Sequence, residues 1–193
     1  MGVDDELAKA LELHQGGDLL SAGTIYREVL AREPDNVDAL NLLGVIMHTA
    51  DDLELAVELI SRATELAPDF VPAFINLGNA LQAAGRPDDA VKKFERALEL
   101  DPGAGIAASN LASALNDLGL HEESRRAGER AVQLLAELPD AHVNLGNALL
   151  GLGRSEAAQA KYTAALERDP HHPGAWFNLG NAHADAGNFR AAV

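Results

Sequence analysis

The chain has 193 residues, nearly half of them apolar, and its 30 acidic and 15 basic residues give a net charge of −15. That charge argues against nucleic acid and anionic membrane surfaces as partners, and the absence of cysteine excludes disulfides, thiol catalysis and thiolate metal sites. No apolar run approaches the roughly 20 residues that span a bilayer, and the acidic start of the chain has no signal-peptide core, so we expect a cytoplasmic protein.

A repeat organises the whole chain. The tetrapeptide Asn-Leu-Gly-Asn begins at Asn76, Asn144 and Asn178, and these starts are 68 and 34 residues apart. A step of 34 residues divides the chain into repeats 3–36, 37–70, 71–104, 105–138 and 139–172 and a partial repeat 173–193. We therefore predict a single array over residues 3–193.

Each repeat has the pattern of two amphipathic helices, because its apolar residues recur at i, i+3, i+4 and i+7. In the third repeat one helix is predicted over 72–84 and a second from 87 to about 99. The first helix of each repeat ends at Gly17, Asp51, Gly85, Gly119, Gly153 and Gly187. A small residue follows five places later at Ala22, Ala56, Ala90, Ser124, Ala158 and Ala192. We predict eleven helices, complete or partial, and no sheet.

Two repeats depart from the pattern. The first has Glu6 and Lys9 at normally apolar positions, which suits a terminal repeat with one face in water. The fourth has Ala108 in place of a bulky residue and Gly128 in place of an aromatic one. Since Gly128 also costs about 1 kcal/mol in a helix interior relative to alanine, we expect loose packing in this repeat.

The third repeat shows a family resemblance most clearly. Its marker residues are Phe74, Leu77, Gly78, Leu81, Gly85, Ala90, Phe94, Ala97 and Pro102. At this spacing the chain resembles the tetratricopeptide repeat (TPR) family, both its idealised consensus repeats and the N-terminal arms of protein O-GlcNAc transferases. The resemblance implies an all-α, right-handed superhelical solenoid of helical hairpins, whose first helices line a concave groove.

The resemblance also places the asparagines in that groove, in two rows. One row consists of Asn76, Asn110, Asn144 and Asn178, and the other of Asn79, Asn147 and Asn181, with Ser113 completing it. A carboxamide offers two donors and an acceptor, which match the N–H and C=O groups of a peptide backbone. The rows are therefore a candidate peptide-binding site. In the alternative interpretation, the amides only tie adjacent hairpins together.

The kind of partner is narrowed by charge. Co-chaperones of this family hold a C-terminal carboxylate with basic groove residues, but the positions before the first asparagine row are Ile75, Ser109, Val143 and Phe177. We therefore do not expect a free C-terminal carboxylate as ligand. Residues 3–70 contain 15 acids and 4 bases (−11), and residues 71–193 contain 15 and 11 (−4), so the acidic end favours a partner with a basic segment. The simpler interpretation, which we prefer, is that these charges only solvate exposed faces of the helices.

The sequence contains fragments of catalytic and metal-binding motifs, but each of them is incomplete. His121-Glu122 begins like a zinc-protease motif, but Arg125 replaces the second histidine. Gly151-Leu152-Gly153 is the ordinary helix-ending loop of the repeat, and His171-His172 has no evident third ligand. We predict no catalytic residue, no metal and no cofactor.

Three functions remain open. The first is a non-catalytic scaffold that binds a peptide or helix in the groove, and the second is the recognition arm of a larger enzyme, such as a glycosyltransferase, sulfotransferase or methyltransferase. The third is a self-assembling structural protein. The second helix of the sixth repeat starts near Asn188 and is cut off at Val193, so we also expect a fragment of a longer protein. We expect it to have an exposed edge around Trp176 and Leu179, through which the chain self-associates.

Overall fold

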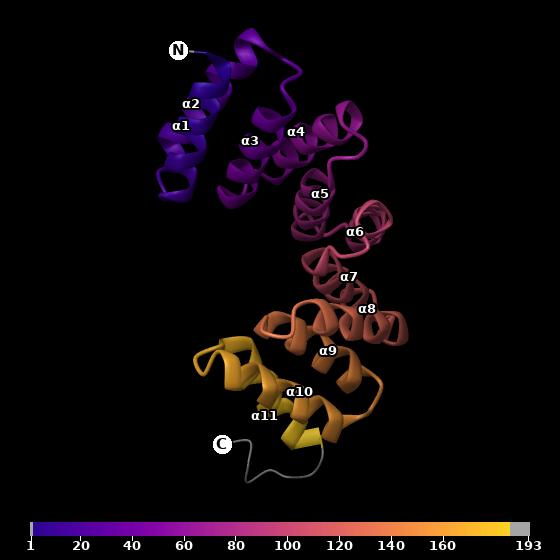
Figure 1. The fold of residues 1–193 in the computed structure, drawn as a ribbon. Helices are drawn as coiled ribbons and strands as arrows, with labels where there is room; N and C mark the ends of the chain where they lie inside the picture. The colour runs from indigo at the N-terminus through magenta and orange to yellow at the C-terminus, as the bar shows by residue number, and fades with distance from the viewer. Residues whose placement is uncertain (1, 186–193) are drawn as a thin grey trace. The chain divides into compact units, whose positions relative to one another are not determined.

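The computed structural model describes residues 2–185, which form eleven helices and no strand (Figure 1). The helices are α1 (Val3–Gln15), α2 (Leu19–Arg32), α3 (Val37–Thr49), α4 (Leu53–Leu66), α5 (Val71–Ala83), α6 (Pro87–Leu100), α7 (Gly105–Asp117), α8 (His121–Leu134), α9 (Pro139–Gly151), α10 (Ser155–Arg168) and α11 (Pro173–Asp185). The predicted all-helical class is confirmed. The expected second helix of the sixth repeat, with Gly187 and Ala192, lies outside the described residues.

The helices group into two compact units, Met1–Arg86 and Pro87–Val193. In the first unit α1 packs on α2 and α3 on α4, and α5 contacts both α3 and α4. In the second unit α6 packs on α7, the pairs α7–α8 and α9–α10 form hairpins, and α11 contacts α9 and α10. The boundary falls inside the third repeat, so the assignment of residues 3–193 to one array stays a prediction.

Side-chain caps and prolines explain where the helices begin. The side chains of Asp18, Asn36 and Asp52 accept hydrogen bonds from backbone N–H groups three residues ahead, at the starts of α2, α3 and α4. Three other helices, α6, α9 and α11, begin at Pro87, Pro139 and Pro173. Proline is favourable at a helix start, because the first N–H groups of a helix have no partner within the helix.

The first helices end in one shared turn. The backbone is left-handed at Gly17, Asp51, Gly85, Gly119 and Gly153, with φ between 64° and 85°. In each turn the following N–H bonds to a carbonyl five residues back, as Arg154 N–H does to Leu149 O at 2.9 Å. Glycine accepts this backbone without strain. The predicted helix-ending positions are therefore confirmed wherever the structure describes them.

Small residues let the two helices of a hairpin approach closely. Five of the six predicted small positions are described, and all are fully buried: Ala22, Ala56, Ala90, Ser124 and Ala158. A Cβ built on Gly44 would lie 2.3 Å from the Ile60 side chain, and one on Gly146 would lie 2.5 Å from the Tyr162 ring. Neither position has room for a side chain.

The fourth repeat is packed more tightly around Gly128 than its sequence suggests. A Cβ built on Gly128 would lie 3.1 Å from both Cα and Cβ of Leu145, so α8 and α9 are in close contact there. The expectation of loose packing is wrong at this position, because Leu145 of α9 lies directly against Gly128 and leaves no space for a side chain.

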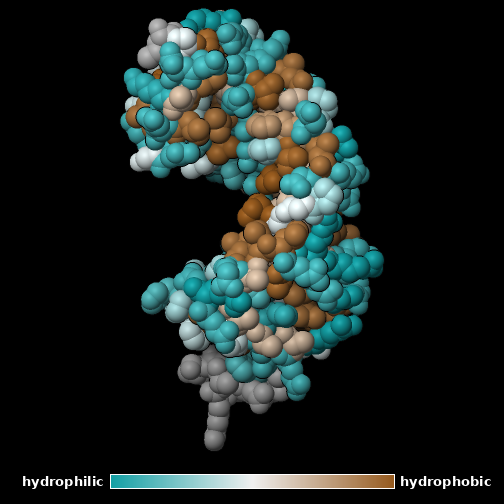
Figure 2. Space-filling model, in the orientation of Figure 1, coloured by the Kyte–Doolittle hydropathy of each residue, from teal (hydrophilic) through white to brown (hydrophobic). Residues whose placement is uncertain are grey.

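At the surface, the polar residues of the first repeat behave as expected of a cap. The Glu6 carboxylate of α1 forms a salt bridge with Arg32 of α2, and Lys9 is exposed. Figure 2 shows hydrophilic side chains over much of the visible face of each unit, with hydrophobic patches between them. None of the helices in the described part of the chain is long and apolar enough to cross a membrane.

Candidate functional site

The predicted site residues all lie on first helices, and within each compact unit these helices are neighbours. The α3 helix contacts α5, α7 contacts α9, and α9 contacts α11. Leu77 and Leu145, between paired asparagines, are buried in the core as predicted. Six of the seven asparagines are half-buried and Asn181 is exposed. The asparagines therefore lie beside the core face rather than in it.

Two asparagines of the first row donate to the preceding first helix. Asn76 Nδ2 donates to Asn41 Oδ1 at 2.9 Å. Asn144 Nδ2 donates to the Ser109 carbonyl at 3.0 Å and to Ser109 Oγ at 3.1 Å. In both cases the two residues are 35 positions apart, so the same bond recurs in the two units.

Asn178 makes an equivalent connection with a different partner. Val143, which lies 35 residues before it, has no polar side chain. Asn178 Nδ2 instead donates to Asn147 Oδ1 at 2.8 Å, and the same oxygen accepts from Tyr162 Oη at 2.9 Å. Asn147 thus joins the neighbouring helices α10 and α11 to α9.

In Asn76, Asn144 and Asn178 the side-chain nitrogen makes a hydrogen bond, whereas the side-chain oxygen makes none within the described part of the chain. Among the described residues, nothing donates to the Oδ1 atoms of Asn76, Asn144 and Asn178. The three oxygens are also absent from the buried polar atoms that lack a hydrogen-bond partner, so they are exposed to solvent. Asn79, Asn110 and Ser113 have interactions of their own. In three of the seven predicted residues, therefore, the nitrogen ties successive hairpins together, and peptide binding by the rows stays a prediction.

Sequence reasoning missed two members of this network, Asn41 and Asn116. Asn41 is 3% exposed and accepts from Asn76, and Asn116 Nδ2 of α7 donates to the Asn144 carbonyl of α9 at 3.0 Å. Asn41 precedes the family's asparagine position by one residue, which is why the 34-residue step passed over it. A search for polar pairs 35 residues apart finds both Asn41–Asn76 and Ser109–Asn144.

Comparison with known proteins identifies the repeat. A family profile described as "Tetratricopeptide repeat" matches residues 7–69, 75–141 and 143–193. The chain belongs to the tetratricopeptide repeat family. TPR proteins are protein-interaction scaffolds. In a separate comparison, no curated protein matches this chain in sequence.

Solved TPR structures are similar to the chain over most of its length. PilW, described as a widely conserved type IV pilus biogenesis factor, has a TM-score of 0.88 at 20% identity and covers 98% of this chain and 88% of its own. A MamA structure has a TM-score of 0.73 at 23% identity, covering 87% and 92%. YrrB, described as "a TPR protein with an unusual peptide-binding site", has a TM-score of 0.71 at 20% identity and covers 88% of each chain. At these identities the likeness shows the TPR solenoid fold.

The partial zinc-protease motif forms a salt-bridge network of the TPR hairpin. Arg125 Nε donates to Glu122 Oε2 at 2.8 Å, and Arg125 Nη1 donates to Glu129 Oε1 at 2.6 Å. The hydrogen bond from Arg125 lowers the pKa of Glu122 below its ordinary value. The His121 ring packs against Gly151, where a Cβ would lie 2.5 Å from it. Glu122 and Arg125 are therefore held in salt bridges of α8, whereas His121 Nδ1 is buried without a hydrogen-bond partner.

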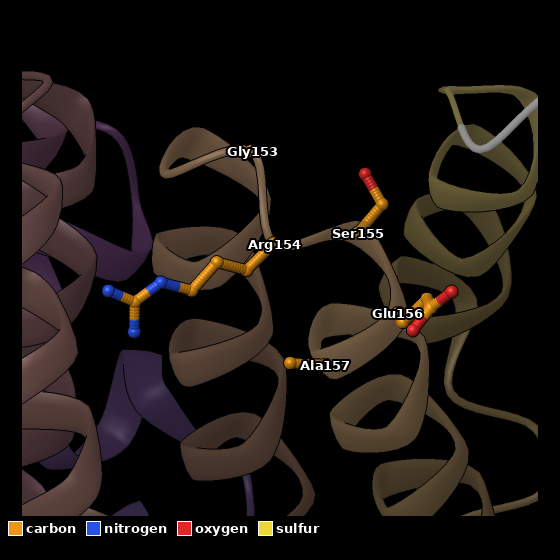
Figure 3. Close-up of a pocket in the computed structure, with 5 residues that line it drawn as sticks. All are labelled: Gly153, Arg154, Ser155, Glu156 and Ala157. Carbon is orange, nitrogen blue, oxygen red and sulfur yellow. The ribbon is translucent and has the colours of Figure 1, made fainter.

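The Gly151-Leu152-Gly153 loop ends α9 and opens a shallow hollow before α10 (Figure 3). In Figure 3 the Arg154 side chain extends away from Ser155 and Glu156, so the polar groups do not converge on one point. The geometry is that of a helix-ending turn rather than a phosphate-binding loop.

Of the adjacent histidines His171 and His172, the second lies at the start of α11 and bonds to two partners. His172 Nδ1 accepts from the Ala175 N–H at 3.1 Å, and His172 Nε2 contacts Asp140 Oδ1 at 2.9 Å. His172 is thus a helix cap that joins α11 to α9. No group of three side chains suited to holding a metal ion occurs within residues 2–185.

Proposed function

We propose that this TPR chain is a non-catalytic scaffold that binds an extended peptide or a helix of a partner protein on the face of its first helices. The observation that supports this is the division of labour in the first asparagine row. The nitrogens of Asn76, Asn144 and Asn178 hold neighbouring helices in place, while their oxygens accept nothing from the described residues.

Such oxygens suit the N–H groups of a ligand backbone. Each nitrogen bond fixes the orientation of its carboxamide, so the oxygen is held in place before a ligand arrives. A peptide N–H that donates to a fixed oxygen contributes about 0.5–1.5 kcal/mol, and the bond does not depend on the peptide's side chains. The structural and the ligand-binding interpretations of the asparagines are therefore compatible, since they concern different atoms.

The partner segment is internal to its chain and carries basic residues. The groove positions one residue before the first asparagine row are occupied by Asn41, Ser109 and Val143 in three repeats, and none of these is basic. Asn41 and Ser109 instead accept hydrogen bonds from asparagines of the next hairpin. A free C-terminal carboxylate has no counter-charge there. The excess of acidic residues in repeats one and two attracts a basic segment and speeds its encounter with the chain. The peptide-binding site reported for YrrB shows that this fold supports such an activity in another protein.

The test is a selection of peptides from a displayed random library against the intact chain. Isothermal titration of a selected peptide is then repeated with the variant N76A/N144A/N178A, which we expect to weaken binding by about ten-fold or more. The matched control is T24A/T163A, which removes two exposed hydroxyls that bond only to their own second helices. Amidating the peptide's C-terminus is expected to leave its affinity unchanged.

Stability must be measured with the same variants. On sequence alone the asparagine substitutions are expected to leave the melting temperature nearly unchanged, but the nitrogen bonds now predict a loss of about 0.5–1.5 kcal/mol per asparagine. Titrations are therefore done where every variant remains folded. A triple variant that loses stability yet binds the peptide as tightly as the wild type would show that the asparagines are structural only.

Self-association is a second candidate, favoured by two exposed aromatic residues on α11. Trp176 is 57% exposed and Phe177 is 70% exposed, whereas Leu179, which the sequence placed at this edge, packs against the core of the preceding hairpin. In the fourth repeat these two positions are occupied by Ala108 and Ser109. We expect light scattering to show association that rises with concentration and is removed by W176A/F177S. A wild type that stays monomeric at high concentration contradicts this.

The remaining assignments stay predictions. They are the cytoplasmic location, the absence of catalysis and the alternative role as the recognition arm of a larger enzyme.

A further inference from the structure

A groove lies on the second compact unit, away from the asparagines described above. It has a volume of about 340 Å³ and is bounded by α6, α7 and α8. Its floor consists of Leu98, Leu111, Leu115 and Ala127, each 7–8% exposed. This narrow apolar strip takes one or two side chains rather than a whole helix face. A second hollow extends the groove to Glu99, and the residues that line both are Glu95, Leu98, Leu111 and Arg130.

One small residue distinguishes this part of the fourth repeat. The positions that correspond to Ala127 in the other repeats are Ile25, Leu59, Lys93 and Lys161, all with larger side chains. In the fourth repeat only a methyl group lies at this position, in the lining that it shares with Leu111 and Leu115 of α7.

The two walls of the groove carry opposite charge. Glu95 and Glu99 stand on α6, whereas Arg126 and Arg130 stand on α8 beside Glu123. Arg130 donates to the Pro102 carbonyl at 2.6 Å, and Glu99 pairs with Arg96 at 3.0 Å. Neither Glu95 nor Arg126 has a salt-bridge partner among the residues that the structure describes. Both charges are therefore available to a ligand.

The spacing along the groove is that of a helix. Leu111 and Leu115 are four residues apart on α7, as are the two acids on α6 and the two arginines on α8. Each helix therefore presents matching positions one turn apart, a separation of about 6 Å. A partner helix with side chains at i and i+4 has the same spacing.

We propose that this groove, which we call the Ala127 groove, docks one face of an amphipathic helix from a partner protein. A Leu, Met or Phe of that helix enters the apolar floor. A basic residue one turn away faces Glu95, and an acidic residue on the opposite flank faces Arg126. The opposite charges of the walls set the direction in which the helix lies.

The experiment uses the intact chain and a displayed library of helical peptides of about 18 residues, long enough to be helical in isolation. In each peptide one position is varied among apolar residues. The positions three and four residues away from it are varied among Lys, Glu and Ser. Selection is for binding to the wild type alone, and the affinity of the selected peptides for A127K is then measured. That variant carries the lysine that the third and fifth repeats have at this position, so it is expected to fold.

We expect the selected peptides to share one large apolar residue between a base and an acid, and to bind A127K about ten-fold or more weakly. The charge reversal E95K is expected to weaken the same peptides several-fold. The double reversal E95K/R126E should restore binding to peptides whose acid and base are exchanged. The variant K161A opens the corresponding strip over α9, where the positions of Arg126 and Arg130 are Ala160 and Ala164. It should therefore bind apolar peptides without charge preference.

Four results overturn the proposal. The first is equal affinity of the selected peptides for the wild type and A127K, and the second is insensitivity to both charge reversals. The third is selection of peptides whose acidic and basic residues follow no common pattern. The fourth is concentration-dependent association of the chain with itself that A127K abolishes, because the occupant is then a second copy of the chain. Circular dichroism of A127K serves as the check on its fold.

Discussion

The hairpins α7–α8 and α9–α10 have the same lengths and turns, but they fill their cores differently. At the aromatic position α10 has Tyr162, which is fully buried and bonds to Asn147. At the same position α8 has Gly128, and Leu145 of α9 lies where a side chain would be. The missing large residue at Gly128 therefore leaves no open space beside the glycine, because Leu145 lies there. Ala127, one residue earlier, lines a groove at the surface.

Removing the ring from the fifth repeat should have the largest effect. Tyr162→Ala is expected to destabilise the chain by about 3–5 kcal/mol, since a buried aromatic residue leaves a cavity that packed helices fill only in part. Tyr162→Phe removes only the hydroxyl bond to Asn147 and should cost about 0.5–1.5 kcal/mol. Urea unfolding measures both. A loss for Tyr162→Ala no greater than that for Tyr162→Phe would mean that this repeat also closes over a missing ring.

Adding a ring to the fourth repeat should also destabilise it. A loosely packed repeat predicts a gain from Gly128→Phe, but the Cα of Leu145 lies 3.1 Å from the added Cβ. Because backbone must move to admit the ring, we expect a loss of about 1–3 kcal/mol in urea unfolding. Gly128→Ala is the control for backbone effects, since it adds a methyl group and restores helix propensity. A rise in stability with Gly128→Phe would restore the interpretation from sequence.

The two hairpins should respond equally at their turns, which provides a test of what they share. Gly119 and Gly153 have the same φ of 71°, and a Cβ on either would meet nothing within 4 Å. Alanine at each position should cost about 1–2 kcal/mol through backbone strain alone. Chemical denaturation of the two single variants gives the comparison. Losses that differ by more than the error of that measurement would show that the turns are not equivalent.

The smallest expected difference is in pH dependence. Arg125 lowers the pKa of Glu122 in α8, whereas α10 has Gln159 at the position of Arg125. The Glu122–Arg125 pair contributes stability above the ordinary carboxyl pKa of 4.5, and this contribution is lost as the pH falls through the lowered value. In Glu122→Gln this part of the pH dependence should be absent, and in Glu156→Gln it should be unchanged. Urea midpoints measured from neutral pH to below 4.5 test this.

The sequence alone was sufficient for the helices, the turns and the identity of the core positions. A 34-residue period, apolar residues at helical spacing and a glycine at all but one of the described left-handed turns act within one repeat or one helix. They are therefore visible in the order of residues. Gly17 and Gly153 illustrate this, since the turn needs the same backbone wherever it occurs. The small positions Ala22 and Ala158, both fully buried, were visible in the same way.

Only the tertiary structure decided how neighbouring helices use the side chains between them. It showed that the nitrogen of Asn144 is bonded to Ser109, that Gly128 lies against Leu145, and that Ala127 lines a groove. Each of these depends on the distance between two helices, which is the result of all the side chains packed between them at once. A repeat pattern specifies which residues face each other, but a shift of one ångström between helices determines which of their atoms bond.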